Sequence, residues 1–437
     1  MKRRVVAVGA GVLAFALMGC GAGGPHGSAA TELTVDTVAG VERWLLPGSG
    51  RQALEVSVDT VTVIGGALIE DDAYQFDRVT LNGLASDAAG RLYLLDPLGS
   101  RVLVYDSLGA HVATHGRSGG GPGELGSPSS LAIGPGDSIW VADFGNRRYT
   151  VYPPDGGEPR SVGYPGDQVP DGPLSIDESG LLQILRPFLI GRSDGSAGDS
   201  ETNPPRTILR LDAEGTVLDT LWVSRPPKVD EANSSGSSPG GTTRIAIRMP
   251  QAFEPSLTWR RFSDGGIVIS DSAAYTLHLV DADGTVRRRI ERDLPPRETT
   301  EADREFARER VRERMGRGGG LRVAIGGAAA GRDIAMPSMD QLLEAQLAAM
   351  TFAPVVPRIT GIRVDPLDRI WVGVSLDEPE TTGRVDLYDR EGNLLGEWYG
   401  GELPDVFLGP SLAARIVRDE LEVQQVVVYR IEVSDAR

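Results

Sequence analysis

The side chains that could carry out nucleophilic or metal chemistry are few and widely separated in this chain. It has one cysteine, Cys20, and four histidines, which are His26, His111, His115 and His278. A metal centre or a Ser-His-Asp triad needs several such groups to converge. His26 lies in a glycine-rich N-terminal segment, and His111 and His115 lie on or beside one strand-like run. We therefore expect no catalytic residue and no enzymatic activity.

A glycine-rich segment, GRSGGGPGELGSPSSLAI at 116–133, has the composition of a phosphate-binding loop. A loop of that kind is followed by Gly-Lys-Ser or Gly-Lys-Thr and by a helix whose N-terminus faces the phosphate. Neither follows here, because the residues after the glycines form the strand-like run SSLAI. We predict that 116–128 joins two pieces of sheet and binds no nucleotide.

Charged side chains recur at corresponding positions of a repeated pattern. Aspartate ends three apolar runs, arginine ends a fourth, and arginine begins the run that follows two of them. Two interpretations are open. We favour the first, in which the aspartates accept backbone N–H bonds in hairpin turns and pair with the arginines that follow. In the second, the whole set contacts a ligand. The set comprises Asp96, Asp143, Asp271, Arg101, Arg148 and Arg186.

Five copies of one unit, aligned without gaps, must position these side chains. Each copy has a turn, an apolar strand-like run, a second such run and a closing turn glycine. The two turns lie 19 residues apart in three copies, from 90 to 109, from 137 to 156 and from 265 to 284. A sixth copy without turn glycines occupies 414–429. The first runs are GRLYLLD (90–96), DSIWVAD (137–143), GLLQILR (180–186), GGIVISD (265–271) and DRIWVGV (368–374).

The segment GPGELGSPSSLAIGPGDSIWVADFGNRRYTVYPPDG, at 121–156, resembles an NHL repeat, the blade unit of a β-propeller. Residues 56–437 as a whole resemble the six-bladed propeller lipoproteins of exported bacterial proteomes. The resemblance implies an all-β fold, a six-bladed β-propeller. VDTVTVIGG, at 58–66, matches the outer strand of a blade but has no blade of its own. We predict that it pairs beside 423–433 and closes the ring, which removes the exposed sheet edge.

Aromatic residues at two kinds of position have different predicted roles. Tyr93, Trp140 and Trp371 share a mid-strand position of the repeat, so we predict that they pack between neighbouring blades. Trp259 and Arg260 lie on the inner strand of the fourth blade. Because inner strands border the central channel of a propeller, we regard these two residues as candidate ligand contacts.

Extra residues interrupt the repeat at 191–206, 224–254, 293–357 and 375–383. In a propeller, the connections from second to third strand and the connections between blades reach the same face. All four insertions are therefore predicted on one face, while the turns of the other face stay short. Loops carry specificity when a rigid scaffold presents them. We interpret the insertion-rich face as a recognition surface.

The longest insertion, about 293–357 between blades four and five, is predicted to be partly helical. A helix begins at 300 and runs to about 315, and a capping-box pattern opens a second helix over 338–350. The apolar, glycine-rich residues 321–331 between them are predicted to lie beneath the helices as a lid on the channel.

The resemblance also implies an alternative function, a metal-dependent, calcium-type lactonase or lyase that uses the central channel. Six-bladed relatives of that kind bind calcium or zinc through Glu, Asp, Asn or His at the entry ends of several inner strands. Those positions hold Asn82, Ser129, Pro173, Thr258 and Thr360 in this chain. Asn82 is thus a weak metal candidate. We expect no cofactor, and calcium is required by the alternative alone.

The N-terminal residues MKRRVVAVGAGVLAFALMGC have the form of a bacterial export signal. A basic start precedes an apolar run that is too short to span a bilayer comfortably. LMGC at 17–20 resembles the lipobox, so we predict a signal peptide at 1–19, an acyl anchor on Cys20 and a lipidated tether and lead-in over 20–55. Gly21 after the cysteine favours the outer membrane, by resemblance to diderm lipoproteins.

Charge and architecture together narrow the expected function. The formal net charge of −17 repels the phosphates of nucleic acids, so DNA and RNA are not expected as partners. The sequence predicts a binding or scaffold propeller anchored in the bacterial cell envelope. We expect it to recognise a protein, peptide or glycan through its loop-rich face.

Overall fold

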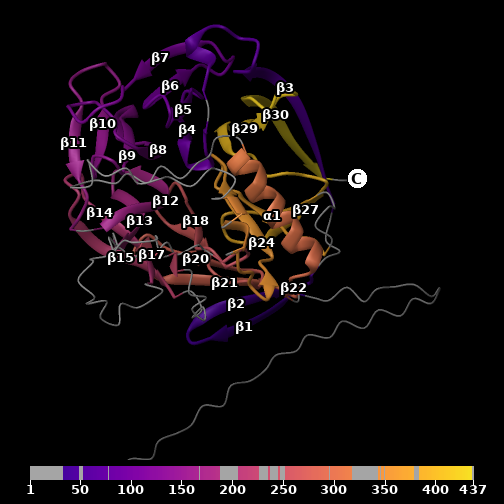
Figure 1. The fold of residues 1–437 in the computed structure, drawn as a ribbon. Helices are drawn as coiled ribbons and strands as arrows, with labels where there is room; N and C mark the ends of the chain where they lie inside the picture. The colour runs from indigo at the N-terminus through magenta and orange to yellow at the C-terminus, as the bar shows by residue number, and fades with distance from the viewer. Residues whose placement is uncertain are drawn as a thin grey trace, which may run out of the picture.

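A computed structural model shows that the chain folds into a six-bladed β-propeller, as predicted (Figure 1). It describes residues 33–435 except 49–52, 77, 167, 188–204, 226–234, 237–244, 247–250, 295, 317–342, 345, 349 and 378–382. Six antiparallel blades stand around a central axis, each with its first strand innermost and its fourth strand outermost.

Blades one to three each consist of four strands that follow one another along the chain. The apolar runs of the repeat, rich in Val, Leu and Ile, form the second strand of each blade. Blade one contains β4 (Leu84–Ser86), β5 (Leu92–Asp96), β6 (Arg101–Tyr105) and β7 (His111–His115). Blade two contains β8 (Pro128–Ile133), β9 (Ile139–Asp143), β10 (Arg148–Tyr152) and β11 (Arg160–Gly163). Blade three contains β12 (Gln168–Asp177), β13 (Gly180–Pro187), β14 (Arg206–Leu211) and β15 (Val217–Ser224).

Blades four and five repeat this order, and blade six combines the two ends of the chain. Blade four contains β18 (Thr258–Arg261), β19 (Ile267–Ser270), β20 (Thr276–Val280) and β21 (Val286–Arg292). Blade five contains β24 (Ile359–Val364), β25 (Ile370–Val374), β26 (Arg384–Tyr388) and β27 (Leu394–Tyr399). Blade six contains β28 (Val406–Gly409), β29 (Leu412–Arg418), β30 (Gln424–Asp435) and β3 (Leu54–Ile64).

The ring is closed by β3, which precedes all the other blade strands in sequence. β3 pairs antiparallel with β30, with Val58 opposite Ile431 and Ile64 opposite Val426. This pairing supplies the outer strand of the last blade and confirms the prediction made from 58–66. β3 thus covers the outer edge of β30, where another chain could otherwise pair.

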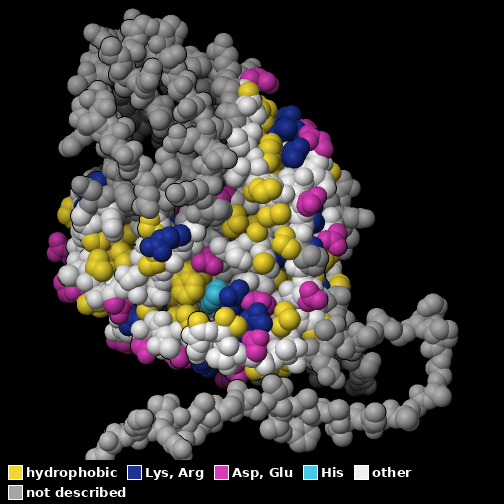
Figure 2. Space-filling view, turned by 90° about the horizontal axis from the view of Figure 1, so that it is seen from below, with side chains coloured by type: hydrophobic (Ala, Val, Ile, Leu, Met, Phe, Trp, Pro, Cys, Tyr) yellow, Lys and Arg dark blue, Asp and Glu magenta, His cyan; other side chains and the backbone are white. Residues whose placement is uncertain are grey.

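A β-hairpin extends blade four outwards, within the segment for which we predict a tether and lead-in. Its strands are β1 (Thr34–Val38) and β2 (Val41–Leu46), and β2 runs parallel to β21. The Arg288 guanidinium lies 3.6 Å from the centre of the Trp44 ring and 2.7 Å from Glu42, which fixes the hairpin to the blade. Figure 2 views the molecule from this side and shows acidic and basic side chains intermixed rather than a patch of one sign.

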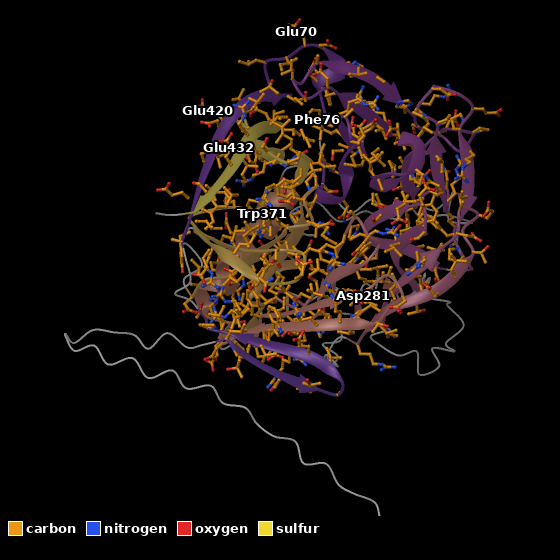
Figure 3. The ribbon with its side chains drawn as sticks, turned by 180° about the vertical axis from the view of Figure 1, so that it is seen from behind. Glu70, Phe76, Asp281, Trp371, Glu420 and Glu432 are labelled. Carbon is orange, nitrogen blue, oxygen red and sulfur yellow. The ribbon has the colours of Figure 1, made fainter. Side chains whose placement is uncertain are left out.

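Each pair of neighbouring blades encloses its own hydrophobic cluster. Tyr93, Trp140 and Trp371 lie in three of these clusters with exposed fractions of 3%, 2% and 1%. Their predicted packing between blades is confirmed. Figure 3 shows Trp371 and Phe76 within the ring of sheets and Glu70 on its outer rim. The blades are therefore held together by side chains of the repeat itself.

The four insertions leave the blades on one face, which we call the insertion face. They connect β13 to β14, β15 to β18, β21 to β24 and β25 to β26. Because successive strands alternate in direction, all these connections reach the face where the inner strands begin. The smaller elements are η1 (Asp72–Tyr74), η2 (Leu81–Gly83), η3 (Pro135–Asp137), β16 (Ser235–Gly236) and β17 (Ile245–Ala246).

The longest insertion contains the helix predicted from residue 300, α1 (Glu301–Gly316). β22 (Arg297–Glu298) pairs with β23 (Val355–Val356) at its base, and α1 crosses in front of blades five and six in Figure 1. The described residues of the second predicted helix, 343–344 and 346–348, are helical, and the predicted lid at 321–331 lies outside the described residues. Within the described ranges, no helix has the length and apolar character that crossing a membrane requires.

Candidate functional site

The central channel contains two adjoining cavities. A cavity of about 540 Å³ is lined by the inner strands of all six blades. A second cavity, of about 600 Å³, lies where the inner strands begin, at the insertion face, and we call it the mouth chamber. Arg310 of α1 forms part of its wall, so the longest insertion helps to build it. Both cavities are lined by Leu81, Asn82, Pro173, Trp259, Arg260, Arg363 and Asp405.

The mouth chamber is rich in arginine. Four arginines and two carboxylates line it, whereas the whole chain has a formal net charge of −17. The chamber is thus positively charged in an otherwise acidic protein. A recessed site lined by an excess of one charge concentrates ligands of the opposite charge. The charged residues are Arg260, Arg310, Arg363, Arg415, Glu402 and Asp405.

Arg260, on the inner strand β18, has no carboxylate partner among the described residues. Its Nη1 donates a hydrogen bond of 2.7 Å to the carbonyl oxygen of Trp259. Burial lowers the pKa of Arg260, and the charge of Arg363 lowers it further. The pKa of Arg260 remains at about 9, so the guanidinium is protonated at neutral pH. A charged and uncompensated side chain therefore lines the chamber.

Arg260 and Arg363 occupy the same register position in adjacent blades. Each lies opposite the mid-strand residue of its neighbouring second strand, as Ala85 and Ala132 do in blades one and two. A small apolar side chain is therefore sufficient for blade packing at this position. Blade packing therefore does not itself require a cation at this position; Nε of Arg363 in addition donates to the Asp405 carbonyl at 3.3 Å.

Arg363 has a weak counterion. The side chain is 7% exposed, and Nη1 donates to the Ile362 carbonyl at 2.8 Å. Its Nη2 lies 3.9 Å from Oδ1 of Asp405, at the outer limit of an ion pair. The other oxygen of Asp405 accepts the backbone N–H of Ile416 at 2.7 Å, and burial raises the pKa of Asp405. Arg363 thus has one distant carboxylate, and Arg260 has none among the described residues.

Charged groups deeper in the channel are, by contrast, closely paired. Arg261 lies 2.5 Å from Asp177, and Arg369 lies 2.7 Å from Asp365. Asp365 also accepts the indole N–H of Trp371 at 2.9 Å. These carboxylates hold turns and core side chains in place. The imbalance of charge is therefore a property of the mouth chamber rather than of the whole channel.

Two of the residues predicted from the repeat form the expected hairpin-turn contact. Asp96 accepts the Gly99 N–H at 3.1 Å and Nε of Arg101 at 3.0 Å. Arg101 also forms an ion pair with Asp72, in the connection from β3 to β4. This geometry fits the structural interpretation that we favour for these side chains.

The predicted pairing of Asp143 with Arg148 is wrong. Asp143 accepts backbone N–H groups of Gly126 and Ser127, with a shortest distance of 2.8 Å. Both residues lie in the glycine-rich segment 116–128, which we call the joint. Arg148 donates to the Gly121 carbonyl of the same joint at 2.6 Å. The joint's backbone groups lie within reach of both side chains, and a contact to its backbone replaces the direct pair. The segment 116–128 connects β7 to β8, as predicted.

The other predicted residues lie apart from one another. Asp271 accepts the indole N–H of Trp222 at 3.0 Å. Trp259 is 1% exposed and packs in the cluster between blades three and four, so Arg260 rather than Trp259 offers its polar group to the channel. The side chain of Arg186, in β13, and the whole of Cys20 lie outside the described residues.

The residues of the mouth chamber do not fit a calcium ion. Calcium takes six to eight oxygen ligands, many of them carboxylates. Asn82 lines the chamber, as expected of an entry position, but Glu402 is ion-paired with Arg415 and Asp405 lies beside Arg363. In the described parts of the chain, no group of three or more His, Cys, Asp or Glu residues could hold a metal.

Arg363, Arg310 and Asp405 are not among the site residues predicted from the sequence. A signal for Arg363 is present, because the alignment of GGIVISD with DRIWVGV places Arg260 and Arg363 five residues before corresponding turn positions. Arg310 has no such signal. Its place in the chamber depends on how α1 lies over the channel, which no local pattern encodes.

Comparisons with known proteins show similarity at the level of the fold. No family model matches the chain, and no curated protein matches it. One similar solved structure is a Bacteroides vulgatus protein from a family of unknown function, with TM-score 0.49, 11% identity and coverage of 87% of this chain and 99% of that chain. Another is calcium-binding regucalcin from Agrobacterium tumefaciens, with TM-score 0.37, 12% identity and coverage of 90% and 97%. A gluconolactonase from Xanthomonas campestris has TM-score 0.35, 15% identity and coverage of 89% and 98%. The NHL-repeat resemblance stays a prediction.

Proposed function

We propose that this protein is an exported binding propeller without catalytic activity, which is anchored in the cell envelope through Cys20 and recognises a protein, peptide or glycan at its insertion face. We propose the mouth chamber as the centre of that surface. The observation that carries the proposal is the contribution of Arg310, from α1 of the longest insertion, to the chamber wall. Blade packing alone would leave a channel there, whereas the insertion turns the channel entrance into a site with its own lining.

The N-terminus of α1 is held firmly over the propeller. Asp303 is 1% exposed and accepts hydrogen bonds of 2.8 and 2.6 Å from Arg297, which lies in β22. It also accepts the backbone N–H and the hydroxyl of Thr300, at 2.9 and 2.6 Å. A recognition element fixed in advance loses little conformational entropy on binding. This anchoring supports a role for α1 in presenting a surface.

The outer side of α1 combines paired charges with one exposed aromatic residue. Phe306 is 49% exposed, whereas Val311 is 6% exposed and faces the protein. Exposed ion pairs along a helix contribute little to stability, because solvent screens them. The pairs are Glu301–Arg304, Glu305–Arg308 and Glu309–Arg312. Phe306 is thus the side chain of α1 best suited to bury apolar surface against a partner.

The alternative, a calcium-dependent lactonase or lyase, has less support. It needs convergent oxygen ligands at the channel entrance, and the two carboxylates of the mouth chamber face arginines instead. A positive chamber repels a divalent cation. The same positive chamber is compatible with the recognition of a protein, peptide or glycan.

Photo-crosslinking in the cell tests the proposed function. A photoreactive amino acid at Phe306 is expected to crosslink to a discrete envelope component. The control position is Leu108, which is 72% exposed in the β6–β7 turn on the opposite face. We expect no crosslink from Leu108. Absence of a crosslink from Phe306, or the same crosslinks from both positions, would contradict the proposal.

A further inference from the structure

We infer that the mouth chamber binds an oxyanion, a carboxylate or phosphate group of the ligand, at Arg260 and Arg363. This inference rests on the proposed function and adds the chemistry that the ligand must carry. The chamber volume of about 600 Å³ is within the range of small-molecule sites, so it has room for the group and for the part of the ligand that bears it.

Arg260 and Arg363 lack a close counter-charge among the described residues. Arg260 has no ion pair with any residue that the structure describes, and Arg363 has one carboxylate at 3.9 Å. The remaining arginine of the inner strands near this level, Arg261, is paired with Asp177 at 2.5 Å. The chain therefore supplies close partners for its neighbouring arginine but not for these two.

Two guanidinium groups without a close counterion are an energetically costly arrangement. A buried charge is stable when a partner of opposite sign compensates for lost hydration, and two like charges in a recessed site repel each other. The repulsion is evident at Arg260, where the charge of Arg363 lowers the pKa. An anion between the two groups would compensate both charges at once.

Arg260 has N–H donors that are free to bind an anion. Nη1 of Arg260 is bonded to the Trp259 carbonyl, and its Nε and Nη2 have no partner among the described residues. A guanidinium group presents its donors in a planar fork that matches the oxygens of a carboxylate or phosphate. The unbonded edge of Arg260 is therefore suited to receive such a group.

The repeat itself does not require an arginine at the positions of Arg260 and Arg363. At this register position Ala85 and Ala132 serve the first two blades, so the fold does not require a long side chain there. Arg310 adds positive charge to the chamber wall and has no ion pair within the described part of the chain, whereas Glu402 compensates the charge of Arg415. The charge is thus concentrated where a ligand would enter.

Binding and thermal unfolding of the full-length mature protein test the inference. Galacturonate and inorganic phosphate serve as probes, with galactose as the neutral match of galacturonate. At least one anion is expected to bind and to raise the melting temperature, because ligands that bind the folded state stabilise it. Galactose is expected to have no effect. Binding by galacturonate alone would identify a carboxylate ligand, and binding by phosphate alone a phosphoryl ligand.

Substitutions separate binding from folding. Arg260→Met is expected to weaken anion binding by about tenfold or more, as is typical when a hydrogen bond to a charged group is lost. The ligand-free variant is expected to melt no lower than the wild type, because an uncompensated charge is replaced by an apolar chain. Arg260→Lys keeps the charge and is expected to retain partial binding. Arg43→Gln, on the outer hairpin, changes the net charge equally and is expected to leave binding unchanged.

Three results would overturn the inference. They are the absence of binding by both anions, unchanged binding in Arg260→Met, or equal weakening in Arg43→Gln. Should Arg260→Met fail to fold, the comparison of Arg260→Lys with Arg43→Gln decides in its place. If neither anion binds while the Phe306 crosslinks persist, the oxyanion site is rejected and the proposed function stands. If the photoreactive amino acid at Phe306 gives no specific crosslink, the proposed function itself is rejected.

Discussion

Two arginines on blade four differ in whether neighbouring carboxylates compensate their charge. Arg292 lies 2.6 Å from Asp386 and is hydrogen-bonded to Glu397, and all three side chains are fully buried. Its Nε donates to the Pro47 carbonyl at 2.9 Å, so it joins blades four and five to the N-terminal segment. Arg260 has no comparable partner among the residues that the structure describes. Arg292 is therefore a structural residue, whereas Arg260 is the residue to which we assign ligand binding.

This contrast predicts opposite effects of the same substitution. Arg292→Met leaves the buried Glu397 without a cation and Asp386 with Arg384 alone, and it is expected to lower the free energy of unfolding by about 3–5 kcal/mol. Arg260→Met is its matched control and is expected to cause no such loss. Urea unfolding of the two variants provides the measurement. A similar loss of stability in both would show that Arg260, too, is a structural residue.

At the scale of the element, α1 depends on one carboxylate. Burial opposes the ionisation of Asp303, but hydrogen bonds from Arg297 and Thr300 lower its pKa from 3.8 to about 2. A folded-state pKa below the unfolded value means that the carboxylate stabilises the helix fully above pH 3.8. The stabilisation is lost as the pH falls from 3.8 through about 2.

Acidification is therefore expected to release α1 before the blades unfold. Hydrogen exchange in residues 301–312 should accelerate between pH 4 and pH 2, after correction for the intrinsic pH dependence of exchange. Asp303→Asn should show the faster exchange already at neutral pH, because a buried ion pair is broken. The blade strand β9 is the internal control. Exchange in α1 that is the same in wild type and Asp303→Asn would disprove the anchoring role.

At the scale of the whole molecule, the ring could be predicted from the sequence because its determinants are local and repeated. Turn residues and apolar runs recur at fixed spacing, and each strand pairs with its neighbour in the chain. Even the closure by β3 was predictable, since 58–66 matches an outer strand and the last blade lacks one. Interblade packing of Trp371 followed from its position in the repeat.

Features that depend on contacts between distant segments could not be predicted. The two strands of the hairpin at 34–46 pair with each other. The position of the hairpin beside β21 is set by tertiary contacts, such as the contact of Arg288 with the Trp44 ring. Arg148 turns from Asp143 to the joint's carbonyl oxygens because that loop folds over it. The mouth chamber combines residues from several blades and α1, so its charge is visible only in three dimensions.

The central claim is that an acidic propeller carries a positive chamber that receives an oxyanion. Crystal structures of the full-length mature protein, one grown with galacturonate and calcium and one with phosphate, test it most directly. We predict an oxyanion bound to the guanidinium groups of Arg260 and Arg363, with no calcium in the mouth chamber. A calcium ion coordinated by Asn82 and Asp405, with no anion on either arginine, would contradict the account.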